Sequence, residues 1–120
     1  MNEMRPLTAD ERAILDWFLD EWAELAPLRS AVSAETVAHV FTADDGYRTI
    51  SLPWATAPTA LPAESPFPEE AEATINGKHF DAILFTTSEG LMLEMTWNPE
   101  WPGRLPSRAE LRPTRTRSVG

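Results

Sequence analysis

Residues 70–86 read EAEATINGKHFDAILFT, and this stretch decides the fold. Asn76 and Gly77 both tolerate the positive φ of a type I′ turn, which makes them the strongest hairpin signal in the chain. The residues on either side, 70–75 and 78–86, are therefore predicted to be two antiparallel strands. The apolar AILF run in the second strand predicts that this strand is covered on both faces.

Alternating side chains predict more strands on both sides of this hairpin. Residues 36–42 and 47–54 alternate around an Ala-Asp-Asp-Gly turn, so we expect them to form a second hairpin. Residues 91–97 alternate after a turn at 87–90 and predict a half-buried strand. Tight turns force antiparallel neighbours, which gives about five strands in a meander.

The N-terminal part predicts a helix. Thr8 and Glu11 form a capping-box pattern, and apolar residues then recur at helical spacing from about residue 9 to 24. Pro27 should end or kink this helix, and it can then start a short second turn. Ser107 and Glu110 are spaced to cap one closing helical turn. The expected fold class is α+β, with an N-terminal amphipathic helix packed on a roughly five-stranded antiparallel meander sheet.

We expect one domain over residues 1–112 and a basic flexible tail over 113–120. Residues 53–68 carry five prolines and predict a long loop, either a plain connector or a binding surface. The longest apolar runs are too short to span a bilayer, and no secretory signal pattern opens the chain, so the expected location is cytoplasmic and not membrane-bound.

The charge distribution is the most informative feature of the composition. The 120 residues have a net charge of −9 and no cysteine. Residues 1–103 carry five basic and eighteen acidic side chains, a net −13, whereas 104–120 carry five arginines and one glutamate, a net +4. A body of this charge repels phosphate backbones, so it argues against nucleic-acid binding. The lack of cysteine excludes disulfides and thiolate metal sites.

Signals for catalysis or cofactors are weak. The chain has no phosphate-binding glycine loop, serine-hydrolase elbow or His-Glu-x-x-His pattern. Its two histidines, His39 and His79, lie on different predicted strands, and strand-face histidines bonded to neighbours are the simpler interpretation. We therefore expect no enzyme activity, no cofactor and no metal ligand.

Acidic residues make the main candidate site. Asp16, Asp20 and Glu24 follow one stripe of the predicted helix with Glu21 beside them, although like charges at that spacing are unfavourable. The stripe is either a solvated face that maintains solubility or a docking surface for a basic partner. A second candidate patch comprises Glu69, Glu70 and Glu72.

Several short motifs at both ends also resemble a known group of proteins. They are Pro6-Leu7-Thr8, Glu11-Arg12, Ile14-Leu15-Asp16-Trp17, Leu28-Arg29, Gly90-Leu91, Leu93-Glu94, Trp97 and Leu105-Pro106. The chain thereby resembles small uncharacterised bacterial domains that open with a Leu-Thr-x-Glu-Glu-Arg helix and close with a strand, a tryptophan and a Leu-Pro segment. Such domains are similar to the immunity-type proteins that accompany bacterial toxins. The resemblance covers about half of the chain and carries over no catalytic residue.

The leading hypothesis is a cytoplasmic, non-catalytic acidic protein of the immunity or antitoxin kind, which masks a basic protein partner such as a toxin. One alternative is a small-ligand-binding or enzyme-like domain with a cleft between helix and sheet near His39, His79 and Tyr47. Another is a homodimeric structural module formed through an exposed strand edge.

Overall fold

The computed structural model describes residues 2–21, 25, 28–29, 32, 36–43, 46–56 and 70–113. In chain order the elements are β1 (Asn2–Arg5), α1 (Ala9–Glu21), β2 (Ala38–Ala43), β3 (Tyr47–Pro53), β4 (Glu70–Ile75), β5 (Lys78–Thr86), β6 (Gly90–Asn98), the 3-10 helix η2 (Arg108–Glu110) and β7 (Arg112–Pro113). The fold of these residues is mixed α+β with an N-terminal α-helix, which confirms the expected class.

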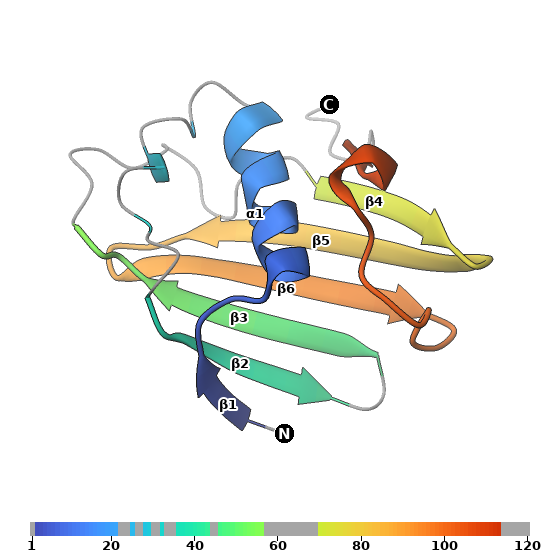
Figure 1. Ribbon diagram of the computed structural model, residues 1–120, viewed down its shortest axis with the longest axis horizontal. Coiled ribbons are helices and arrows are strands. Elements are labelled where there is room, and N and C mark those ends of the chain that lie inside the picture. The colour runs from blue at the N-terminus through green and yellow to red at the C-terminus, as the bar shows by residue number, and fades with distance from the viewer. Residues whose placement is uncertain are drawn as a thin grey trace, which may run out of the picture.

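The seven strands found in the described residues form one antiparallel sheet in the order β1-β2-β3-β6-β5-β4-β7 (Figure 1). The expected number of about five strands is therefore wrong, and so is the simple meander, because β3 pairs with β6 and not with β4. A tight turn forces its two strands together, but the proline-rich connection between β3 and β4 imposes no such pairing.

The two strands that the sequence did not predict are the edges of the sheet. β1 pairs with β2, and all but one of its four residues are exposed. β7 contributes only two residues, which pair with Ala71 and Glu72 of β4. An exposed edge strand has no buried face, so it shows no alternation of apolar and polar side chains.

The predicted hairpins are confirmed. At the β4–β5 turn, Asn76 has φ 53° and Gly77 has φ 77°, the left-handed conformations that the Asn-Gly pair favours. β2 and β3 pair as expected, and Gly90 opens the predicted strand β6. A Cβ on Gly90 would lie 2.3 Å from the carbonyl oxygen of Leu52, so a side chain at this position would push β3 and β6 apart.

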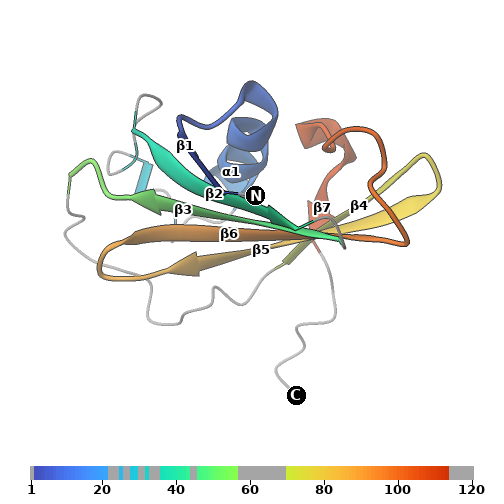
Figure 2. The ribbon, with the colours of Figure 1, turned by 90° about the horizontal axis from the view of Figure 1, so that it is seen from below.

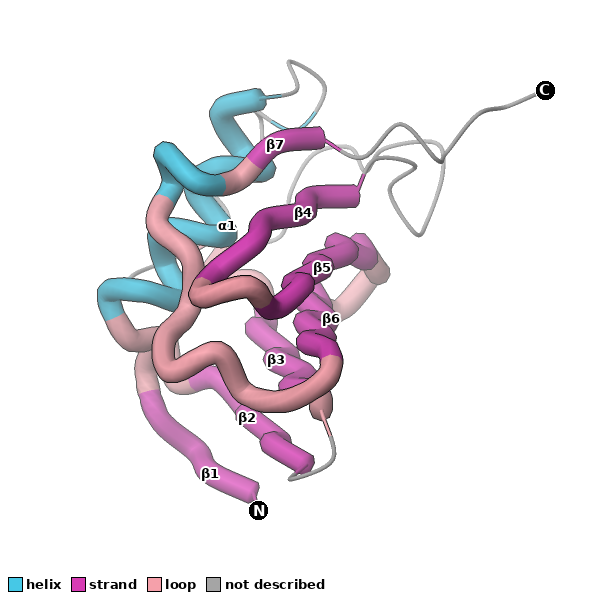
Figure 3. Tube along the Cα trace, turned by 90° about the vertical axis from the view of Figure 1, so that its right-hand side faces the viewer, coloured by secondary structure: helices cyan, strands magenta, loops and turns pink. Residues whose placement is uncertain are grey.

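The core lies between the sheet and a layer on one of its faces. Figure 2 shows α1 and the C-terminal segment with η2 on that same face, and Figure 3 shows this segment leaving β6 and reaching the helix side before it enters β7. The largest apolar side chains that are fully buried are Phe18, Phe80, Ile14, Leu19, Leu25, Leu28, Ile50, Ile75, Leu84, Met95 and Val40. The opposite face, here called the outer face, carries no helix within the described residues.

Some expectations lie outside the described residues. These are the end of the helix at residues 22–24, the turn around Pro27, the loop from residue 57 to 68 and the tail from 114 to 120. Pro113, which we assigned to the tail, belongs to β7.

The predicted capping box at the start of α1 is present and forms part of a larger charged cluster. The backbone N–H of Thr8 donates to Glu11 Oε1 at 2.9 Å, and the N–H of Glu11 donates to Thr8 Oγ1 at 3.1 Å. The Glu11 side chain is fully buried. Arg5 donates to the two carboxylate oxygens of Glu11 at 2.7 and 2.9 Å, and Arg48 of β3 donates to Glu11 Oε2 at 2.9 Å.

These contacts set the charge state of Glu11. Burial is the largest single influence and by itself raises the pKa, but hydrogen bonds from Arg5 and the Thr8 amide, together with the charges of Arg5 and Arg48, lower the pKa below its ordinary 4.5. A carboxylate with a lowered pKa stabilises the fold fully above the unfolded-state pKa, and this stabilisation is lost as the pH falls through the folded-state pKa.

Glu11→Gln should therefore reduce the free energy of unfolding at pH 7 by about 3 kcal/mol, because two arginines lose their buried anion. The difference from the wild type should shrink as the pH falls below about 4.5. Urea titrations from pH 3 to 7 measure this. Glu3→Gln is the control, since Glu3 contacts the same Arg5 at 3.4 Å but from an exposed position. Equal losses in the two variants would show that the buried cluster has no special role.

Candidate functional site

The acidic stripe of α1 lies among arginines. Asp16 accepts from Arg12 Nε and from Arg29 Nη1, each at 3.2 Å. Asp20 pairs with Arg29 and, at 2.5 Å, with Arg108 of η2. Two carboxylates of the proposed docking stripe are thus neutralised within the chain, one of them partly by the C-terminal segment.

The other two residues of the stripe differ. Glu21 is exposed at the end of α1 and forms no ion pair with the residues that the structure describes. Glu24 lies outside the described residues. The excess of negative charge inferred from the sequence is therefore absent at Asp16 and Asp20.

The second predicted patch belongs to a different surface, the outer face of the sheet. Glu70 and Glu72 lie on β4 with intermediate exposure, whereas Glu69 is outside the described residues. The strand register adds two carboxylates that the sequence analysis did not single out, Asp81 of β5 and Glu94 of β6. We call Glu70, Glu72, Asp81 and Glu94 the carboxylate cluster.

The register brings like charges together in this cluster. Glu72 is directly opposite Asp81, and Ile83 is opposite both Glu70 on one side and Glu94 on the other. Like charges facing each other across strands destabilise a sheet. Glu94 forms no ion pair within the described part of the chain. Glu72 has Arg112 Nε at 3.7 Å, but the Arg112 side chain is 66% exposed, which makes this a weak surface pair.

A hollow of about 140 Å³ lies within the carboxylate cluster. Its lining includes Glu70, Asp81 and Glu94, with Ile83 between Glu70 and Glu94 and with Thr96 opposite Asp81. Acidic groups around an apolar centre suit a cationic side chain with a hydrocarbon stem, because the stem covers the isoleucine while the charge reaches the carboxylates.

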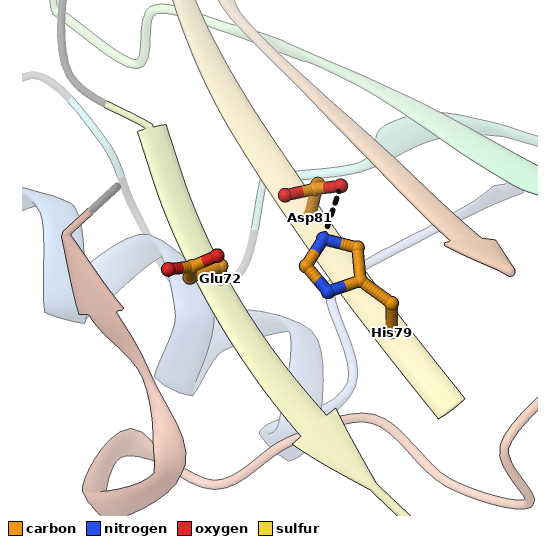
Figure 4. A group of neighbouring side chains, drawn as sticks. All are labelled: Glu72, His79 and Asp81. Atoms are coloured by element: carbon orange, nitrogen blue, oxygen red, sulfur yellow. Dashed lines mark ion pairs between the residues drawn. The ribbon is translucent and has the colours of Figure 1, made fainter. Parts of the chain in front are cut away.

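One edge of the cluster also contains a histidine. Figure 4 shows Glu72 of β4 beside His79 and Asp81 of β5, with the three side chains on the same side of the two strands. His79 Nε2 lies 2.9 Å from Asp81 Oδ2, and the ligand atoms of all three residues lie within 4.8 Å of one another. Imidazole nitrogen and carboxylate oxygen are donors for divalent transition metals.

The structure does not bring together His39, His79 and Tyr47, the residues of the alternative prediction of a ligand-binding or enzyme-like cleft. His39 is on β2 and His79 on β5, about 14 Å apart across the strands and about 20 Å apart along them. Both lie on the outer face and not between helix and sheet. His39 Nε2 is 3.2 Å from Asn2 Oδ1, and Tyr47 packs on Phe41 with ring centroids 5.8 Å apart.

Two further features bear on the remaining alternatives. A hollow of about 310 Å³ at the other end of the sheet has no histidine among its described lining residues, which are Ser51, Leu52, Pro53, Thr87, Glu89, Gly90, Leu91 and Met92. The homodimeric alternative requires a free strand edge, and the two edges of the described sheet are β1 and β7.

Glu110, a carboxylate with a strongly lowered pKa, lies outside these hollows. The hydrogen bond from Arg104 and the Ser107 backbone N–H lower the pKa of Glu110 to about 2. These contacts confirm the predicted closing turn, η2, at Ser107 and Glu110.

The arginine contacts of α1 predict a loss of stability when the stripe is reversed in charge. Asp16→Lys together with Asp20→Lys puts lysines against Arg12, Arg29 and Arg108. Solvent screening at these partly exposed positions limits the expected loss to about 1 kcal/mol in the free energy of unfolding. Urea denaturation measures it.

Glu21→Lys is the matched control on the same helix. It should cause no loss, since a cation is favourable at a helix C-terminus. Unchanged stability of the double variant would mean that the arginine contacts do not stabilise the fold in solution.

Comparison with known proteins gives no family to which these features can be assigned. No family model, curated protein or solved structure matches the chain.

Proposed function

We propose that this chain is a non-catalytic acidic binding protein that masks a basic protein partner, in the manner of an immunity or antitoxin protein. The docking surface is the carboxylate cluster on the outer face of the sheet, which extends the second sequence patch. The proposed location is the cytoplasm, where a cysteine-free fold is at no disadvantage because disulfides are rare there.

The observation that carries this proposal is the juxtaposition of like charges by the strand register. Glu72 and Asp81 are direct cross-strand neighbours, and Glu94 lies one strand further in the same layer. This arrangement is unfavourable for the isolated sheet, and a cationic partner relieves it. On α1, by contrast, arginines of the chain itself supply the counter-charge for Asp16 and Asp20.

The chemistry of the surface favours a protein partner with lysine and arginine side chains. The negative body of the chain attracts such a partner over a distance of about 10 Å at moderate salt and speeds the encounter. The hollow between Asp81 and Glu94 then provides a position for one cationic side chain. Such a complex blocks whatever the basic surface of the partner would otherwise contact, so masking needs no catalytic group.

A charge reversal within the cluster tests the proposal. Glu94→Lys should weaken binding of a short oligolysine peptide by about tenfold at 50 mM salt, because one attractive charge becomes repulsive. Isothermal titration calorimetry measures the affinity. The difference should diminish at 500 mM salt, where exposed charges are screened.

The matched control is Glu21→Lys, which makes the same change of net charge on α1. It should alter the affinity by less than about twofold. Amide shifts in NMR spectra of the peptide complex should concentrate on β4, β5 and β6. Equal effects of the two variants, or shifts centred on α1, would contradict docking at the carboxylate cluster.

A further inference from the structure

We propose that Glu72, His79 and Asp81 form a binding site for one divalent transition-metal ion of the zinc type. The three residues combine one imidazole nitrogen with two carboxylates, and they belong to the hairpin that is best determined by the sequence. This inference does not rest on the proposed binding of a basic protein.

The backbone already places the three ligands on one face. His79 and Asp81 are two residues apart on β5, so their side chains leave the strand on the same side. Glu72 is directly opposite Asp81 on β4. The tight turn at Asn76 and Gly77 fixes this register, so the backbone does not need to move when an ion binds.

Only side-chain rotations are needed to close the site. The ligand atoms lie within 4.8 Å of one another, while two ligands on one zinc ion are about 3–4 Å apart, given bonds of about 2.0–2.2 Å. The side chains of His79 and Asp81 are 49% and 36% exposed, so their rotamers are free to adjust. An ion between them replaces the present contact between His79 Nε2 and Asp81 Oδ2.

The donor set selects the kind of ion. Calcium and magnesium prefer oxygen ligands throughout, whereas imidazole suits zinc and its first-row neighbours. A neutral imidazole and two carboxylates balance a doubly charged ion, and the ion removes the repulsion between Glu72 and Asp81. Three protein ligands leave coordination positions for water.

One contact competes with the ion. Arg112 Nε lies 3.7 Å from Glu72 Oε1, but its side chain is mostly exposed. A surface pair at this distance contributes little, so a metal ion displaces it.

Titration with zinc chloride tests the site, because the chain has two histidines and no cysteine. The wild-type protein should bind one zinc ion per chain in calorimetry. His79→Gln should weaken this binding by at least about tenfold, and His39→Gln, the matched change on the same face of the sheet, should leave it within about twofold. Circular dichroism verifies that both variants fold.

A paramagnetic ion locates the site directly. Copper(II), an ion that imidazole suits, should broaden the amide signals around residues 72, 79 and 81 before any others, and excess magnesium should not displace zinc. Unchanged zinc affinity in His79→Gln, an equal loss in His39→Gln, or broadening spread over the whole acidic surface would overturn the proposal.

The outcomes for zinc and for the basic peptide are separable. Glu94→Gln leaves all three metal ligands in place, so zinc affinity should stay within about threefold. His79→Gln keeps the four carboxylates, so oligolysine binding should stay within about twofold. Failure of the wild-type protein to bind zinc would therefore refute the metal site alone, and failure of the wild-type protein to bind oligolysine would refute the docking surface alone.

Discussion

The buried ion cluster at Glu11 joins the layers of this fold. Glu11 lies in the first turn of α1, and it accepts hydrogen bonds from Arg5 of β1 and Arg48 of β3, so the helix start is tied to two strands of the sheet. The same Arg48 lies 5.7 Å from the centre of the Trp101 ring, which connects the cluster to the C-terminal segment. A buried carboxylate without these arginines would be strongly unfavourable, so the position of the helix and the arginine contacts depend on each other.

The two faces of the sheet handle charge differently. On the helix side, five arginines neutralise Glu11, Asp16 and Asp20, and they are Arg5, Arg12, Arg29, Arg48 and Arg108. On the outer face, the strand register opposes Glu72 to Asp81 and leaves Glu94 in the same layer. Carboxylates that pair with arginines of the same chain contribute to the stability of the fold. On the outer face, Glu72 directly faces the like charge of Asp81, which is unfavourable for the sheet, and the proposed cationic partner would relieve this repulsion.

The sequence predicted local structure well because local structure depends on neighbouring residues. The Thr8–Glu11 capping box, the Asn76–Gly77 turn and the alternation in β6 each lie within a few positions of one another. The pairing of β3 with β6 and the edge strand β1 depend on residues far apart, and they leave no periodic signal. The pairing of Glu72 with Asp81 could nevertheless have been predicted from the sequence, because it follows from counting residues outward from the Asn76–Gly77 turn. The contact between Asp20 and Arg108 was not, because it joins residues 88 positions apart.

The proposed metal site and the proposed docking surface would meet the same electrostatic constraint with different chemistry. A divalent ion at Glu72 and Asp81 would cancel two of the negative charges that are proposed to attract a basic partner, so each ligand would reduce the affinity for the other. Linkage requires this reduction to be equal in both directions. Imidazole coordination is short-ranged and depends on His79, whereas attraction of a polycation is long-ranged and screened by salt. A zinc-loaded surface would therefore keep its shape while its negative electrostatic potential decreases. Zinc would thereby lower the affinity for the proposed basic partner.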